Sequence, residues 1–105
     1  MNSIAWLIFV VAALLEVSGD AAVRRGLRSS STTWVLLGCI MLAVYGLVVN
    51  SVKWDFSRLL GVYIAFFAVV SVLFGRFVFA ETIPNSTWCG LAFIVLGGAL
   101  IQFGR

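Results

Sequence analysis

Apolar residues fall into four long runs along this chain, and clusters of polar and charged residues separate the runs. Arginines and the stretch SSSTT follow the first run, KWDFSR closes the second, Arg76 ends the third and ETIPNS precedes the fourth. A helix needs about 20 mostly apolar residues to cross about 30 Å of hydrocarbon. The pattern therefore predicts four membrane-spanning helices, at about 3–23, 34–52, 59–75 and 87–103.

The composition agrees with this pattern, because 63% of the 105 residues are hydrophobic and only 10% are charged. Lipid leaves backbone polar groups no partner outside the chain, and this chain is too short to close a barrel, so the spans must be helices. We expect an all-α integral membrane protein that forms a single four-helix transmembrane domain over residues 1–105. Ser86 or Thr87 is the expected cap of the last helix.

Charge and residue content exclude several functions. The net charge is +3, and the seven basic residues flank the spans, which suits a lipid bilayer and not nucleic acid. The chain has no histidine, and its two cysteines, Cys39 and Cys89, do not have metal-ligand spacing. We therefore expect no metal, no cofactor and no enzyme activity, since no nucleophile has a base at workable spacing.

The basic residues are almost evenly divided between the two sides of the membrane. Four spans would place Lys53, Arg58 and Arg105 on one side, and Arg24, Arg25, Arg28 and Arg76 on the other. This balance permits insertion in both orientations, and two copies could then form an antiparallel homodimer with its two-fold axis in the membrane plane. The alternative is that the arginine cluster after the first span selects one orientation.

Two acidic residues lie inside the first run. A carboxylate deep in lipid costs at least about 2.5 kcal/mol for Asp at a helix centre, so it rarely occurs without a role. Asp20 is one turn before Arg24 and is expected to pair with it or to reach the interface. Glu16 is eight residues before Arg24, so its counterion is expected to be a proton, a cationic ligand or a residue of another segment.

Small residues surround Glu16 in the sequence. Ala12, Ala13 and Gly19 leave room for a ligand or for close approach of another helix. Burial disfavours the charged form of a carboxyl group, so we expect Glu16 to exchange a proton near neutral pH. The alternative is a permanently neutral Glu16 that is hydrogen-bonded to a neighbouring helix.

Three stretches resemble the small multidrug resistance transporters, within the drug/metabolite transporter superfamily. LEVSGDAAVR, residues 15–24, is similar to the first-helix signature, with a Glu-Val pair, a glycine three residues after the Glu and a basic residue eight after it. GVYIAF, residues 61–66, resembles the third-helix segment whose aromatic residues line the binding cavity. Residues 78–101 are similar to the third loop and fourth helix, and the resemblance covers nearly the whole chain.

The resemblance implies a proton-coupled antiporter, built as an antiparallel homodimer in the bacterial inner membrane, that exports small hydrophobic organic cations. Glu16 would bind a proton or a quaternary ammonium or guanidinium ion in mutually exclusive fashion. Tyr63 stands at the position of the third-helix tyrosine and Phe66 at that of a tryptophan. Gly90 and Gly97 would carry the dimer contact.

Departures from the family pattern indicate a divergent branch. Phe66 lacks the indole donor, and the run from Phe67 to Val70 replaces the small residues that let this helix bend. Tyr45 is only near the position of the second-helix tyrosine. Asp20 replaces a hydroxyl or small residue, and could receive the planar fork of a guanidinium ion. The rival interpretation is a membrane bundle without transport activity that serves as a subunit, scaffold or lipid-associated factor.

Overall fold

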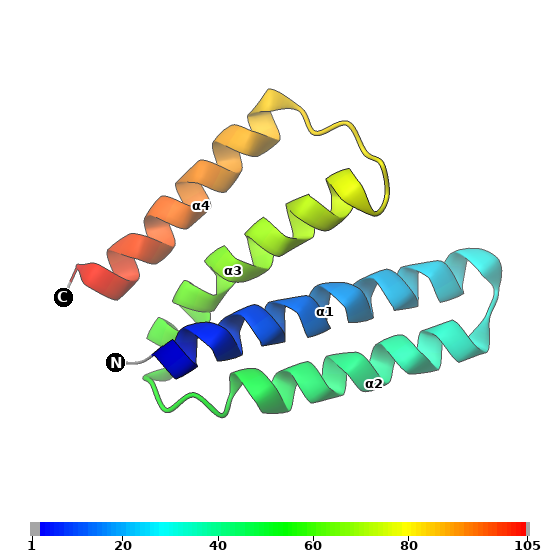
Figure 1. Ribbon diagram of the computed structural model, residues 1–105, viewed down its shortest axis with the longest axis horizontal. Helices are drawn as coiled ribbons and strands as arrows, with labels where there is room; N and C mark the ends of the chain where they lie inside the picture. The colour runs from blue at the N-terminus through cyan, green and yellow to red at the C-terminus, as the bar shows by residue number, and fades with distance from the viewer. Residues whose placement is uncertain (1–2, 105) are drawn as a thin grey trace. The chain divides into compact units, whose positions relative to one another are not determined.

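The computed structural model describes residues 3–104, which form four α-helices and, within that range, no strand. The helices, labelled in Figure 1, are α1 (Ser3–Ser29), α2 (Thr32–Val49), α3 (Phe56–Phe77) and α4 (Asn85–Phe103). All four are long and apolar enough to cross a membrane. The predicted all-α fold with four spanning helices is therefore confirmed. Arg105, counted above in the charge balance, lies outside the described residues.

The first helix is longer than the hydrophobic pattern predicts. α1 continues six residues beyond the predicted end at Val23 and includes the three arginines that were expected to end it. Arginine is a good helix former, and the single Gly26 weakens a helix without ending it. The helix ends at Ser29, and Ser30 then adopts a left-handed φ of 56° that turns the chain.

Two other helix boundaries also differ from the prediction. α2 ends at Val49, three residues before the predicted end of the second span. The N-cap of α4 is Pro84, and not Ser86 or Thr87. The reason is that the Pro84 carbonyl already accepts the backbone N–H groups of Thr87 and Trp88, at 3.0 and 3.3 Å, so the helical hydrogen bonds begin earlier.

The chain divides into two compact units, one up to Lys53 and one from Trp54 onward. The first unit is the hairpin of α1 and α2, which lie side by side in Figure 1. Glycines set their separation. A Cβ at Gly38 would lie 2.6 Å from the carbonyl oxygen of Gly19 and 2.8 Å from the amide nitrogen of Val23. The two backbones therefore approach more closely than any other residue would allow.

The second unit is the hairpin of α3 and α4. A Cβ at Gly98 would lie 2.9 Å from the Cβ of Ala65, so these two helices also meet at small residues. Near one end of the hairpin, Arg58 donates from Nε and Nη2 to Oε1 of Gln102, at 3.2 and 2.8 Å. The guanidinium carbon of Arg58 also lies 4.0 Å from the ring centroid of Trp54. The two hydrogen bonds to Gln102 thus join the start of α3 to the end of α4, and the cation–π contact joins Arg58 to the loop before α3.

Candidate functional site

Glu16 lies midway along α1, inside the apolar part of the helix, and its side chain is half-buried. Ala12 and Ala13, in the preceding turn, are fully buried, and Gly19, in the following turn, is also buried. The carboxyl group therefore projects from a stretch of helix whose neighbouring side chains are small. Such a stretch lets another helix, or a ligand, come close to the carboxyl group.

Three pairs of facing residues define the register between α1 and α2. They are Gly26 with Val35, Val23 with Gly38, and Gly19 with Leu42. Each step of three or four residues back along α1 is matched by a step of three or four forward along α2, as antiparallel helices with 3.6 residues per turn require. One further step places Glu16 opposite Tyr45. The step after that places Ala12 opposite Val49, and both of these side chains are almost completely buried.

The electrostatics of the first hairpin agree with this register. The hydroxyl of Tyr45 lies within range of the negative charges of Glu16 and Asp20. A phenol can donate a hydrogen bond to a carboxylate, and its ring face attracts a cation. The structure therefore brings together three of the candidate site residues that the sequence suggested. In the sequence, Tyr45 was only near the position of the family's second-helix tyrosine. In the structure, it is in register with Glu16.

Asp20 lies one turn after Glu16 on α1, but its side chain is exposed. Its carboxylate is accessible from outside the hairpin, whereas that of Glu16 is partly covered. The expectation that Asp20 pairs with Arg24 or reaches the interface stays a prediction. The two acids therefore differ in how far the hairpin covers them.

The third-helix candidates, Tyr63 and Phe66, belong to the second unit. They are three residues apart and so lie on one face of α3. Tyr63 is buried and Phe66 is half-buried. Their participation in a site with Glu16 stays a prediction.

Gly90 and Gly97 lie on an open face of α4. A Cβ added at either position would meet no atom within 4 Å, whereas one added to the adjacent Gly98 would press on Ala65. Gly98 thus faces α3, and the other two glycines face away from their own hairpin. Their expected role in a dimer contact stays a prediction.

Sequence reasoning named Ala12 and Gly19 but missed the repeat of small residues to which they belong. Small residues recur every seven positions along α1, at Ala5, Ala12, Gly19 and Gly26, and all four are buried. Seven residues are close to two helical turns, so this repeat forms a stripe along one face. The repeat was visible in the sequence, and it would have identified the face of α1 that packs closely. Its partner Gly38 could be recognised only from the structure.

The chemistry of the first hairpin is that of an acid in apolar surroundings beside a phenol. Such a carboxyl group can take up a proton, or can bind a cation whose charge replaces it. Among residues 3–104, no group of three or more His, Cys, Asp or Glu side chains could hold a metal ion. The candidate site is therefore the half-buried carboxyl group of Glu16 beside the phenol of Tyr45.

Four apolar spanning helices, paired in two hairpins and carrying a half-buried acid in the first, define a small multi-pass membrane protein. A family model described as "Uncharacterised BCR, YnfA/UPF0060 family" matches residues 3–105. The chain therefore belongs to the YnfA/UPF0060 family. The match covers all four helices, including the candidate site.

Several relatives share this length and pattern. A UPF0060 membrane protein of Frankia casuarinae is 36% identical over 101 residues, covering 94% of this chain and 92% of the relative. Those of Rhodococcus erythropolis and Pseudomonas paraeruginosa are 33% and 32% identical, with at least 93% of each chain covered. No solved structure matches the chain. The relatives are named as membrane proteins, which agrees with the four apolar helices.

Proposed function

We propose that this protein is a proton-coupled antiporter that exports small hydrophobic organic cations of the quaternary ammonium or guanidinium type. The observation that carries the proposal is Glu16, a half-buried carboxyl group midway along an apolar spanning helix, in register with Tyr45. A carboxyl group at that depth is costly unless it binds something. Glu16 binds either a proton or the cation, and this exclusion couples the two fluxes.

The aromatic and small residues around Glu16 support a cationic substrate. The ring of Tyr45 offers a face for a cation–π contact, worth about 0.5–2 kcal/mol depending on solvent access. Ala12, Ala13 and Gly19 leave space beside the carboxyl group. The resemblance of residues 15–24 to the first-helix signature of the small multidrug resistance transporters supports the same substrate class. Tyr63 and Phe66 are proposed as further aromatic walls.

The proposed transporter is an antiparallel homodimer in the bacterial inner membrane. The near-equal numbers of basic residues on the two sides of the membrane support insertion in both orientations. The open face of α4 at Gly90 and Gly97 supports close contact with a second copy. In such a dimer, the two copies of Glu16 share one chamber, which opens to one side of the membrane at a time.

The proposal predicts that transport depends on Glu16. Purified protein in liposomes with an acidic interior should take up the cation against a gradient, and Glu16→Gln should reduce uptake to that of empty liposomes, because the amide cannot exchange the proton. Uptake is measured with a panel of quaternary ammonium and substituted guanidinium ions of increasing size. Asp55→Asn is the matched control, since it removes a carboxylate from the loop before α3 and should leave uptake unchanged.

A different result would favour the rival function. If wild-type protein moves no member of the panel, or if Glu16→Gln transports as well as wild type, the antiporter proposal fails. The protein would then be a membrane bundle without proton-coupled transport. Helical content and elution volume must match between variant and wild type, so that loss of uptake is not loss of folding.

A further inference from the structure

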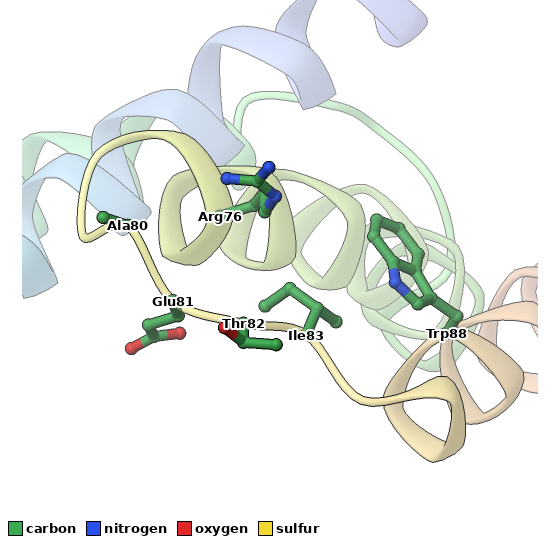
Figure 2. Close-up of a pocket in the computed structure, with 6 residues that line it drawn as sticks. All are labelled: Arg76, Ala80, Glu81, Thr82, Ile83 and Trp88. Carbon is green, nitrogen blue, oxygen red and sulfur yellow. The ribbon is translucent and has the colours of Figure 1, made fainter.

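The loop between α3 and α4 borders an open hollow that the proposed transport does not use. It has a volume of about 270 Å³, and Figure 2 shows the residues that line it: Arg76, Ala80, Glu81, Thr82, Ile83 and Trp88. Arg76 belongs to the last turn of α3, Trp88 to the first turn of α4, and the others to the loop. Drug-sized ligands usually occupy about 300–1,000 Å³, so this hollow fits a smaller polar group.

The hollow lies where lipid headgroups are expected. α3 and α4 are both long and apolar enough to span a membrane, and the hollow is at the end of one and the start of the other. Trp88 is 43% exposed, as is typical of a ring at the boundary between hydrocarbon and water. Phe77 and Phe79, which adjoin the lining residues Arg76 and Ala80 in the sequence, have exposed side chains and offer apolar surface to acyl chains.

Two opposite charges line the hollow without neutralising each other. Within the described part of the chain, no ion pair joins Arg76 and Glu81, and the guanidinium carbon of Arg76 lies 5.4 Å from the ring centroid of Phe77. In Figure 2 the Glu81 carboxylate points away from Arg76, and Thr82 follows it along the loop. The hollow thus presents a positive and a negative group at separate places.

The backbone holds Glu81 in this position. Its N–H donates to the carbonyl of Gly75 at 2.9 Å, and its carboxylate packs against Gly75 so closely that a Cβ there would lie 2.5 Å from Oε1. Ala80 has a left-handed φ of 55°, which turns the chain just before Glu81. The backbone and the carboxylate of Glu81 therefore both contact the end of α3.

We infer that this hollow binds the zwitterionic headgroup of an ethanolamine phospholipid. The guanidinium of Arg76 can bind the phosphate through two parallel hydrogen bonds, and the hydroxyl of Thr82 can donate a third. The Glu81 carboxylate accepts hydrogen bonds from the primary ammonium, and the Trp88 ring adds a cation–π contact. The acyl chains lie along the exposed apolar surface of the helices.

The same chemistry discriminates between lipids. A choline headgroup has no N–H to donate to Glu81, so it loses the charge-assisted hydrogen bonds of the ammonium. A glycerol headgroup brings a net negative charge beside Glu81 and no cation to pair with it. Arg76 alone would prefer such an anionic lipid, so the preference for ethanolamine depends on Glu81.

The test measures which lipid stays bound to the full-length protein. Purified protein is equilibrated with an equimolar mixture of phosphatidylcholine, phosphatidylethanolamine and phosphatidylglycerol with identical acyl chains, and the bound lipids are counted by native mass spectrometry. Wild type should retain phosphatidylethanolamine about tenfold over either competitor, the effect of one charge-assisted hydrogen bond. Arg76→Gln and Glu81→Gln should each abolish the preference.

Arg28→Gln is the matched control, because Arg28 lies in the last turn of a different helix, is also exposed and does not line the hollow. Its lipid preference should equal that of wild type. Equal retention of all three lipids, or preferential retention of phosphatidylglycerol that Glu81→Gln leaves unchanged, would overturn the inference. No cation or pH gradient enters this measurement, so its failure would leave the transport proposal standing.

Discussion

Glu16 and Asp20 are one turn apart on α1, and their surroundings differ. Glu16 is half-buried and in register with Tyr45, whereas Asp20 is exposed. Removing a carboxylate from water is costly unless a proton or a cation neutralises it. We therefore expect Glu16 to carry the proton, and we expect Asp20, which a ligand can reach from outside the hairpin, to recognise the shape of a substrate.

At the residue scale, this difference predicts a substrate-dependent effect of Asp20→Asn. A guanidinium ion can form parallel hydrogen bonds with a carboxylate, and a quaternary ammonium ion cannot. Uptake of guanidinium ions into liposomes should fall about tenfold, the effect of losing one charge-assisted hydrogen bond. Uptake of quaternary ammonium ions should change less than twofold. Equal losses for both classes would show that Asp20 does not distinguish them.

At the scale of elements, glycines decide how closely α1 and α2 pack. Gly38 contacts backbone atoms of α1, while a Cβ at Gly46, two turns later on the same helix, would meet nothing within 4 Å. The register that pairs Glu16 with Tyr45 continues directly from the contacts at Gly19, Val23 and Gly26. The geometry of the candidate site therefore depends on residues that cannot themselves bind a ligand.

These two glycines supply a matched pair of substitutions. Gly38→Ala should lower the free energy of unfolding by about 1–3 kcal/mol, because the added methyl group meets backbone atoms that cannot move aside. Gly46→Ala should raise it by about 0.5–1 kcal/mol, because alanine is the better helix former. Reversible unfolding in mixed micelles with increasing dodecyl sulfate measures both. A Gly38→Ala variant as stable as Gly46→Ala would contradict the close packing of α1 against α2.

At the scale of the whole molecule, the number of basic residues on each side of the membrane governs insertion. The two sides differ by one basic residue, and Arg105 lies at the end of the chain. A bias this small permits insertion in both orientations. An antiparallel homodimer requires that both orientations occur.

We predict that reporters fused to the C-terminus will be detected on both sides of the membrane. Alkaline phosphatase reports the outer side and a fluorescent protein the inner side, and both fusions should be active at similar expression levels. Ser51→Lys adds a positive charge to the loop between α2 and α3, and should shift the population toward the orientation with that loop inside. Activity of only one of the two fusions would rule out dual insertion.

The hydrophobic pattern predicted the four helices well and their ends less well. Each long apolar run is a helix because lipid offers the backbone no other way to pair its polar groups. The helix ends depend on local helix propensity and on capping hydrogen bonds, which the hydrophobic pattern does not show. Arginines continue α1 as a helix beyond Val23, and the Pro84 carbonyl starts α4 before the serine and threonine that were expected to cap it.

The sequence alone determined the membrane class, the four helices and the presence of a carboxyl group, that of Glu16, within an apolar run. These features depend only on composition and on spacing along the chain. The tertiary structure decided that Tyr45 is in register with that acid, that Gly38 sets the helix separation, and that Arg76 and Glu81 line one hollow. These relations join residues on different helices or across a loop. They depend on the register and approach of packed backbones, which no single segment of the sequence specifies.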